Sequence, residues 1–320
     1  MELSPRWDAV NFASGYNTSA TSIVVDNGSY FRAGHIIRNT DTGEQMLVTA
    51  VSTNTLTVTR AFGSTAAAAI TDNDSILIIG DASAEGADSP AVKTTQESKV
   101  TNYTQIFRTP FDVTETADAS EMYGGRDLSY LRKKHGIEHK KDMERAFLFG
   151  EKKEDTSGTQ PRRTTAGLNS YVTTNRTDAS GALTEAEFET FCRSLFRYGS
   201  KKKTLFASPL VVSAINSWAG AKLQVVPSDK TFGISISQYV TGHGTLNLVK
   251  HDLLEQDYSG YAFGVDTSNV MYRPLRDTSL KMNIQDADSD TQKDEYLTEA
   301  GLQVNLEKTH AVLYGVTSYS

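Results

Sequence analysis

The chain has 320 residues, enough for about two domains of ordinary size. Its composition, 38% hydrophobic and 22% charged, is typical of a folded protein and argues against a disordered one. A formal net charge of −7 argues against a protein whose main function is to bind nucleic acid. Cys192 is the single cysteine, which excludes an internal disulfide and a thiolate metal cluster. The longest apolar-leaning run, 66–70, is far too short to span a membrane, so we expect a soluble protein.

The first part of the chain, from Thr18 to Gly80, predicts a small all-β module. Short segments of alternating apolar residues are separated by turn-forming residues, with no helical pattern between them, which is typical of a barrel or curled sheet. The segments are 22–25, 35–38, 44–51, 55–60 and 75–79. A module of about 65 residues is near the lower size limit for independent folding, so we expect an insertion in a larger protein.

The residues from Asp127 to Gly150 predict the longest helix of the chain. Side chains that fall three or four residues apart, from Leu128 to Ala146, share one face. Asp127 can cap the start of the helix, and Gly150 can end it. At 1.5 Å per residue the helix would be roughly 34 Å long, which indicates a structural backbone element. The lysines that lie largely off the shared face are Lys133, Lys134, Lys140 and Lys141.

A mixed α/β region follows from about residue 166. Thr184 and Glu187 form a capping box in front of an apolar helical stripe, and Pro209 favours the start of a second helix. One long extended stretch is expected to close the chain, from 295 to 316. Short strands are expected at 204–207, 233–240, 245–250, 261–265 and 270–273.

The sharpest catalytic motif lies on the long predicted helix. His135, Glu138 and His139 match the H-x-x-E-H pattern, which puts both histidines on one helix face and could hold zinc with Glu138 as the general base. Gly136 loosens the helix, the nearby lysines repel a divalent cation, and no third ligand is evident. A polar helix face packed against a neighbour is the simpler interpretation, and a zinc metallohydrolase is a remote alternative. No other catalytic constellation is complete, so we expect neither an enzyme nor a cofactor.

Several segments resemble those of one viral family in their residues, their order and their spacing. The segments are 101–108 (TNYTQIFR), 113–117 (VTETA), 142–150 (DMERAFLFG), 207–209 (ASP), 299–302 (EAGL) and 310–316 (HAVLYGV). Together they are similar to the major capsid proteins of tailed phages with the Hong Kong 97 fold, in particular to the family of the podophage SU-ten. The resemblance covers nearly the whole chain, from Trp7 to Val316.

The resemblance implies an α+β capsid fold with an inserted, small, barrel-like β module. The family usually has a longer N-terminal arm before the segment around Trp7. We therefore make no prediction about contacts between subunits through this arm. The expected parts are a residual N-terminal arm at 1–17, the β module at 18–85, the return limb of an extended loop (E-loop) at 86–120, a P domain at 121–165 with a spine helix at 127–150, an A domain at 166–295 and a P-domain closing strand at 296–320.

The resemblance also implies a function. We expect the chain to assemble with its own copies, as hexamers and pentamers, into an icosahedral capsid in the host bacterial cytoplasm, and to stay in the virion around packaged double-stranded DNA. Portal, scaffold and decoration proteins are further expected partners, with non-specific contact to the DNA and no membrane. An encapsulin-like nanocompartment shell and a phage tail or decoration protein are the structural alternatives. The residues expected at the assembly interface are Tyr103, Gln105, Phe107, Arg108 and Phe111.

Overall fold

The structure is a computed structural model of the 320-residue chain. It describes residues 5–83, 85–86, 88–90, 99–120, 127–222 and 238–319. The chain divides into two compact units, Met1–Lys99 and Val100–Ser320. Each unit has hydrophobic core residues of its own, so each can be understood by itself.

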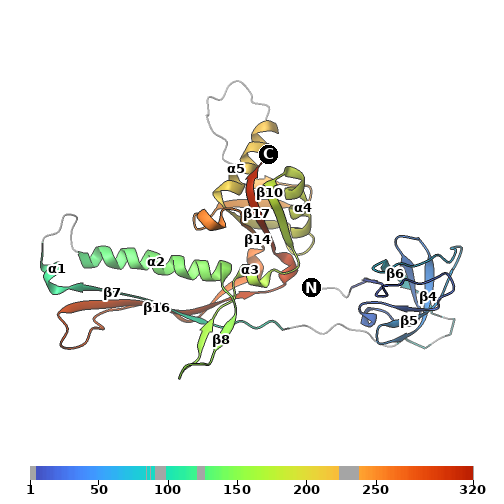
Figure 1. Ribbon diagram of the computed structural model, residues 1–320, viewed down its shortest axis with the longest axis horizontal. Coiled ribbons are helices and arrows are strands. Elements are labelled where there is room, and N and C mark those ends of the chain that lie inside the picture. The colour runs from blue at the N-terminus through green and yellow to red at the C-terminus, as the bar shows by residue number, and fades with distance from the viewer. Residues whose placement is uncertain are drawn as a thin grey trace. The chain divides into compact units, whose positions relative to one another are not determined.

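The first unit is a six-stranded antiparallel β-barrel (Figure 1). A bridge between Val10 and Val25 joins the two outer strands, so the sheet closes on itself. The predicted alternation is present, because inward residues such as Ile37, Met46 and Leu56 are completely buried. In sheet order, the strands are β1 (Trp7–Ala9), β6 (Ser75–Asp81), β3 (His35–Asn39), β4 (Gln45–Ser52), β5 (Thr55–Thr59) and β2 (Ser22–Val24), with a short turn of helix, η1 (Gly28–Tyr30), after β2.

The segment expected as a residual N-terminal arm contributes to this barrel. Trp7–Ala9 pair with β6, and Val10 is completely buried beside Ile23 and Phe31. The expectation of an arm is therefore wrong for residues 7–10. A strand of three residues is too short for its alternation to be seen in the sequence, and its burial depends on strands that lie far along the chain.

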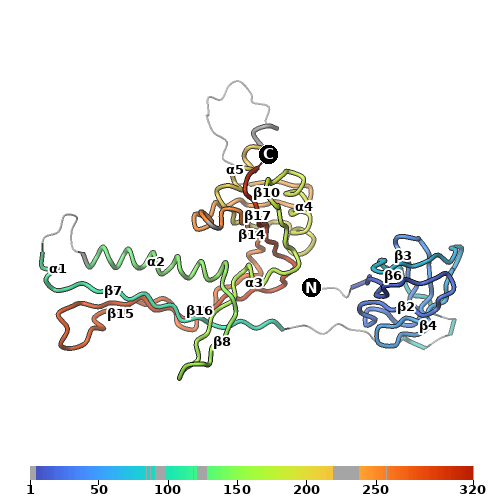
Figure 2. Tube along the Cα trace, in the orientation of Figure 1, coloured from blue at the N-terminus to red at the C-terminus, as the bar shows by residue number. Residues whose placement is uncertain are grey.

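The second unit contains a long, two-layered element that we call the arm. Helix α2 (Asp127–Phe149) lies along an antiparallel sheet of β7 (Gln105–Thr114), β16 (Thr291–Val304) and β15 (Val270–Lys281), with β16 in the centre. Figure 2 shows β15 and β16 beside each other along the helix. The short helix α1 (Glu115–Ala119) follows β7. The predicted helix is thus present, and it ends one residue before Gly150.

The rest of the second unit is built around a mixed six-stranded sheet that we call the head. Helices α4 (Glu185–Leu195) and α5 (Pro209–Lys222) share a core on one face of the sheet, and the predicted capping box at Thr184 starts α4. The opposite face packs on the end of α2 and on β16. In sheet order, the strands are β10 (Arg176–Leu183), β17 (Ala311–Tyr319), β14 (Ala262–Val265), β11 (Lys202–Ala207), β13 (Thr245–Lys250) and β12 (Gln238–Val240).

Short elements connect the arm and the head. They are the hairpin of β8 (Lys153–Asp155) and β9 (Arg162–Thr164), helix α3 (Leu168–Tyr171) and the helical turns η3 (Thr267–Asn269) and η4 (Glu307–Thr309). The turn η2 (Gln256–Tyr258) lies within the head, between β13 and β14. In the part of the chain that the structure describes, no helix is long and apolar enough to cross a membrane.

Some expected strands differ from the observed ones. The single closing stretch is two strands in different sheets, β16 in the arm and β17 in the head, and Leu306 turns the chain between them with a φ of 50°. The strand expected at 270–273 extends to Lys281, because it pairs with the long strand β16 from Val270 to Lys281. Of the strand expected at 233–240, residues 233–237 lie outside the described residues.

Candidate assembly surface

Buried polar contacts fasten α2 to the arm sheet. Arg132 of α2 pairs with Asp294 of β16 at 2.7 Å, and the completely buried Asp294 also accepts a hydrogen bond from the amide of Asn283. Tyr296 donates its hydroxyl to the carbonyl of Arg132 at 3.0 Å. A Cβ at position 136 would lie 3.1 Å from that hydroxyl, so Gly136 permits the close approach of helix and sheet. These contacts fix which side of the helix faces inward.

His139, one of the predicted zinc ligands, is a core residue of the arm. Its Nδ1 lies 2.9 Å from the hydroxyl of Thr109, and its Nε2 lies 2.8 Å from the hydroxyl of Thr298. Burial lowers the pKa of His139, which favours a neutral ring. With both ring nitrogens engaged by threonine hydroxyls, His139 has no nitrogen left for a metal.

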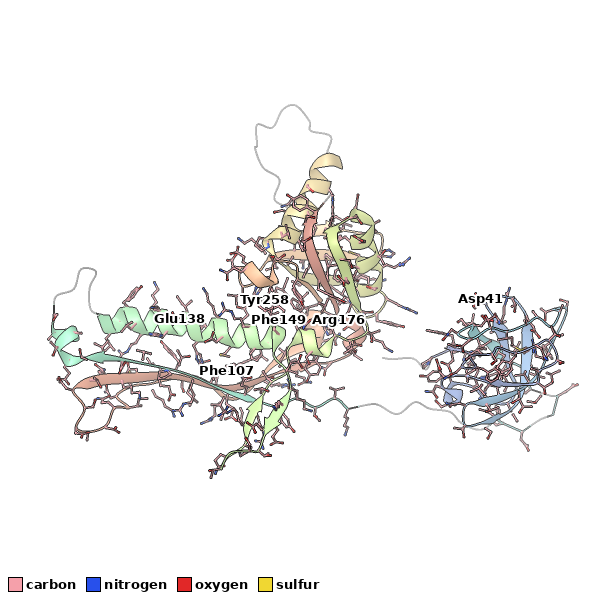
Figure 3. All side chains as sticks on the ribbon, in the orientation of Figure 1. Asp41, Phe107, Glu138, Phe149, Arg176 and Tyr258 are labelled. Carbon is pink, nitrogen blue, oxygen red and sulfur yellow. The ribbon has the colours of Figure 1, made fainter. Side chains whose placement is uncertain are left out.

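The other two members of the motif do not complete a metal site. His135 stacks on Phe111, with ring centroids 4.9 Å apart, and its Nδ1 contacts Glu138 at 2.8 Å. Glu138 lies at the side of α2 (Figure 3). Among the described residues, no three His, Cys, Asp or Glu side chains are grouped so that they could hold a metal ion. The zinc metallohydrolase hypothesis is therefore contradicted by the contacts of His139.

We expect His139→Ala to lower the free energy of unfolding of the second unit by about 2–4 kcal/mol, because it deletes a buried ring and leaves two threonine hydroxyls without their partner. Urea denaturation measures this change. His135→Ala is the control on the same helix, with an expected loss of about 1 kcal/mol from the lost ring stacking. Stoichiometric zinc in the wild type that disappears in His139→Ala would restore the hydrolase hypothesis.

The face of the arm sheet opposite α2 carries a ladder of charged side chains. Side chains alternate along β16, so the neighbours of the residues that contact α2 point the other way. There, Glu295 pairs with Arg108 of β7, and Glu299 pairs with Arg276 of β15 at 2.8 Å. Hydrogen bonds from Arg108 outweigh burial and hold the pKa of Glu295 below its ordinary value. Within the described ranges no helix covers this face, which we call the open face (Figure 1).

Strand β15 adds large apolar side chains at the edge of the open face. Leu275 is 68% exposed, and Met271 and, just after the strand, Met282 are also exposed. Tyr272 points to the other side of the sheet, where its ring packs on Phe147 of α2. Among the residues that the structure describes, β15 pairs with β16 alone, so its outer edge presents backbone groups to solvent. Exposed apolar side chains next to an unpaired strand edge are typical of a surface that another chain covers. We call the open face together with residues 270–284 the candidate assembly surface.

Three of the five residues expected at an interface, Phe107, Arg108 and Phe111, lie on β7, where the pleat of the strand places them on opposite faces of the sheet. Phe107 and Phe111 point toward α2 and are buried, and Phe107 packs edge-on against Phe147. Because these two rings support the chain's own core, we do not propose them as interface residues. Arg108 points to the open face and is exposed.

The remaining two expected residues lie near the β8–β9 hairpin. The side chain of Gln105 accepts a hydrogen bond from the amide of Thr165 at 3.1 Å. The ring of Tyr103 lies within 6 Å of the cationic groups of Lys152 and Arg163. Both residues thus have partners within the chain. Leu275 and Met271 could not be singled out from the sequence, because their strand shows no apolar alternation.

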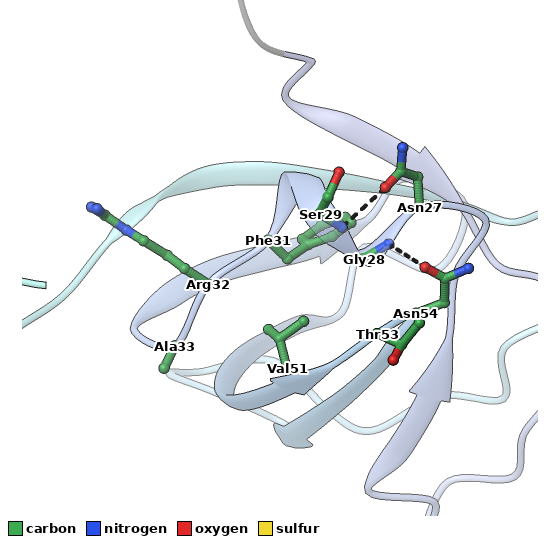
Figure 4. A pocket seen from close by; sticks show the side chains of 9 residues that line it. All are labelled: Asn27, Gly28, Ser29, Phe31, Arg32, Ala33, Val51, Thr53 and Asn54. Atoms are coloured by element: carbon green, nitrogen blue, oxygen red, sulfur yellow. Dashed lines mark hydrogen bonds between the residues drawn. The ribbon is translucent and has the colours of Figure 1, made fainter. Parts of the chain in front are cut away.

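A hollow of about 520 Å³ lies on the barrel beside η1 (Figure 4). The side-chain oxygen of Asn27 accepts a hydrogen bond from the amide of Ser29, and that of Asn54 accepts one from the amide of Gly28. A Cβ at position 28 would lie 2.1 Å from the carbonyl oxygen of Thr53, so the turn requires glycine there. Since these polar groups already bind one another, we assign the hollow no ligand.

The sequence matches one protein family over nearly its whole length. Residues 17–317 match the family described as SU10 major capsid protein. The major capsid protein of Pseudomonas phage PaMx41 is 35% identical to the chain over 150 residues, which are 47% of this chain and 36% of that protein. The chain thus spans about a third of the length of this curated relative.

Solved structures share the fold at low sequence identity. A structure described as Gordonia phage Cozz has a TM-score of 0.50 at 11% identity, with 75% of this chain and 78% of that chain covered. An encapsulin complex from Synechococcus elongatus PCC 7942 has a TM-score of 0.45 at 12% identity, with 68% and 76% covered. The first likeness concerns the fold alone, and the second is too slight to carry an argument.

Proposed function

Because the chain belongs to the SU10 major capsid protein family and has a mixed α+β capsid fold of the Hong Kong 97 type, we propose that it assembles with its own copies into the shell of a tailed phage. The match of residues 17–317 to the family is the observation that carries this proposal. Hexamers and pentamers of the chain form the icosahedral shell in the host cytoplasm, and the shell encloses double-stranded DNA in the virion. The role is structural and not catalytic.

The parts of the chain take distinct roles in this proposal. The arm corresponds to the P domain, with α2 as its spine helix, and the head corresponds to the A domain that meets its copies around the symmetry axes. The barrel is an insertion in or beside the E-loop. Portal, scaffold and decoration proteins are the proposed partners besides the chain itself.

The candidate assembly surface supports this function. Closed symmetric assemblies need surfaces that fit other copies of the same chain, and a stable interface buries roughly 800 Å² on each partner. A long arm with one uncovered face offers more area to a neighbour than a compact domain of the same size. On that face the charges pair within the chain, as Arg276 and Glu299 do, which leaves Leu275 and Met271 as the apolar contacts for a neighbour.

We expect the double variant Met271→Asp, Leu275→Asp to reduce shell formation at least tenfold, because two carboxylates would have to be buried unpaired in the interface; a factor of ten corresponds to about 1.4 kcal/mol. Negative-stain electron microscopy and light scattering count the closed shells. Circular dichroism should show an unchanged fold, since both side chains are exposed in the single chain.

Ile79→Asp is the matched control, because Ile79 is also an exposed apolar strand residue but lies on the barrel, outside both the candidate assembly surface and the head. It should assemble like the wild type. Equal assembly of all three proteins would exclude the proposed surface. Fixed rings or trimers of the wild type, in place of closed shells, would favour a tail or decoration protein and contradict the shell function.

A further inference from the structure

The outward side of α2 carries four lysines, Lys133, Lys134, Lys140 and Lys141, which we call the lysine stripe. At 3.6 residues per turn these four positions share the side of the helix opposite His139 and Met143, both of which are buried against the sheet. All four lysines are exposed. Tyr130 and Ile137 lie on the same side and are also exposed. The stripe is therefore a surface of the arm distinct from the open face.

Nearby acidic groups neutralise little of the lysine stripe. Glu138 lies 4.0 Å from Lys134 at the exposed side of the helix, where an ion pair contributes little. Glu144 is engaged by the ring of His251 at 2.7 Å.

The remaining acids near the stripe are also paired elsewhere. Asp142 lies 3.6 Å from Arg145, and Asp252, which faces Lys141, pairs with Lys250 at 2.9 Å. Among the described residues Lys133, Lys140 and Lys141 form no ion pair. A chain with a net charge of −7 thus concentrates positive charge on one helix face, where Lys134 is the one stripe lysine with an ion pair among the described residues.

We propose that the lysine stripe contacts the phosphate backbone of the packaged DNA, an inference that rests on the proposed shell function. The pairs 133–134 and 140–141 are seven residues apart, about 10.5 Å at 1.5 Å per residue. One DNA strand carries a phosphate about every 3.4 Å along the helix axis, so a stripe of this length lies within reach of more than one phosphate. A lysine ammonium is a point charge that binds phosphate without reading the sequence. The contact is therefore non-specific and sensitive to salt.

Weak contacts of this kind suit the inner wall of a shell. Each subunit supplies one stripe, so many sites of low affinity act together on one DNA molecule. The DNA is then held near the wall while each single contact still forms and breaks rapidly. A tight, sequence-reading site would instead need side chains that reach base edges, and the exposed Tyr130 and Ile137 offer no such paired donor and acceptor groups.

The test is the salt dependence of DNA binding by the full-length chain before shell closure, measured by fluorescence anisotropy with a labelled DNA duplex. Each neutralised phosphate contributes about −0.9 to the slope of log K against log salt concentration. Replacement of all four stripe lysines by glutamine should therefore flatten the slope by about 3 to 4. A variant that removes the same charge elsewhere, with glutamine at Lys152, Lys153, Lys201 and Lys202, should change the slope by less than about 1.

Shell formation, followed by electron microscopy for each variant, separates this inference from the proposed function. We expect the stripe variant to assemble normally and to bind DNA more weakly. An unchanged salt slope in the stripe variant would overturn the inference. Lost assembly with an unchanged slope would also overturn it, and would mean that the stripe binds an acidic surface of a neighbouring copy instead of DNA. A wild type that binds DNA through the stripe but never forms shells would contradict the proposed function instead.

Discussion

Replacing Glu44 with alanine is expected to cost the barrel about 3–5 kcal/mol of unfolding free energy, because it leaves a buried charge without its partner. The buried carboxylate accepts hydrogen bonds from Nε and Nη2 of Arg60 at 2.8 and 2.7 Å and from the amides of Ala61 and Ala68. The side chain of Arg60 is only 6% exposed. A small unit with about 5–15 kcal/mol of total stability would lose much of it.

The same network makes the barrel sensitive to acid. Burial alone raises the pKa of Glu44, but the hydrogen bonds from Arg60, Ala68 and Ala61 outweigh it and hold the pKa below the ordinary value of 4.5. Below that value the unfolded chain binds more protons than the folded chain, so the stabilisation is complete above pH 4.5 and is lost as the pH falls through the folded pKa. We expect this acid-induced loss to be smaller in Glu44→Ala, which lacks the titrating group.

Hydrogen exchange followed by mass spectrometry measures both effects, because it resolves barrel peptides from those of the second unit. Asp41→Ala is the matched control, since Asp41 is an exposed acid on a turn of the barrel (Figure 3), and we expect it to change stability by less than about 0.5 kcal/mol. Wild-type protection of the barrel peptides in Glu44→Ala would contradict the prediction.

The elements that the sequence predicts well are those that bury one face. Strands β3, β4 and β5 alternate between buried and exposed positions, and α4 combines a capping box with an apolar stripe. In these cases the local pattern and the tertiary burial agree. The closure of the barrel could not be predicted, because the bridge from Val10 to Val25 joins a three-residue strand to a partner that its own sequence does not indicate.

The strands of the arm show where local patterns fail. β15 is exposed along nearly its whole length, so it has no buried face to produce an alternation of apolar and polar residues. In β16 and β17, by contrast, buried residues follow one another almost without interruption, and the two strands merge into one apparent stretch. The break between them is made by Leu306 with a positive φ, a conformation that a leucine does not signal.

For the candidate sites, too, local sequence patterns could not show which distant residues would be in contact. The spacing of His135 and His139 correctly predicted one helix face, but it could not reveal which groups the face would meet. The hydroxyls that satisfy His139 come from Thr109 and Thr298, which are 30 and 159 residues away. Only the pairing of β7 with β16 brings both threonines under the same ring. Without that register, a satisfied core histidine and a metal ligand have the same sequence pattern.

The second large effect is expected at Lys203, a buried residue of β11. Its ammonium group donates hydrogen bonds to the carbonyls of Leu195, Tyr198 and Thr309 at 2.6–2.7 Å. An ammonium has three donors, and here each has an acceptor. Burial lowers the pKa of Lys203 to about 8, so the amine still carries its proton at pH 7.

We expect Lys203→Met to destabilise the head by about 3 kcal/mol, because methionine fills the space of the stem but leaves the buried carbonyls of Leu195 and Thr309 without a donor, at about 1–3 kcal/mol each. Leu195 is the last residue of α4, Tyr198 follows shortly after it, and Thr309 ends the helical turn that leads into β17. The ammonium therefore fastens the end of a helix to the start of a central strand. The loss should appear in both segments at once.

Hydrogen exchange of peptides from α4 and β17 tests this coupling. In Lys203→Met both should lose protection together, whereas the barrel should be unchanged, since it is a separate compact unit. Lys202→Met is the matched control, because Lys202 is the exposed neighbour on the same strand. Equal protection in the two variants would mean that the three carbonyls find other donors. Loss in α4 alone would mean that Lys203 caps the helix without holding β17.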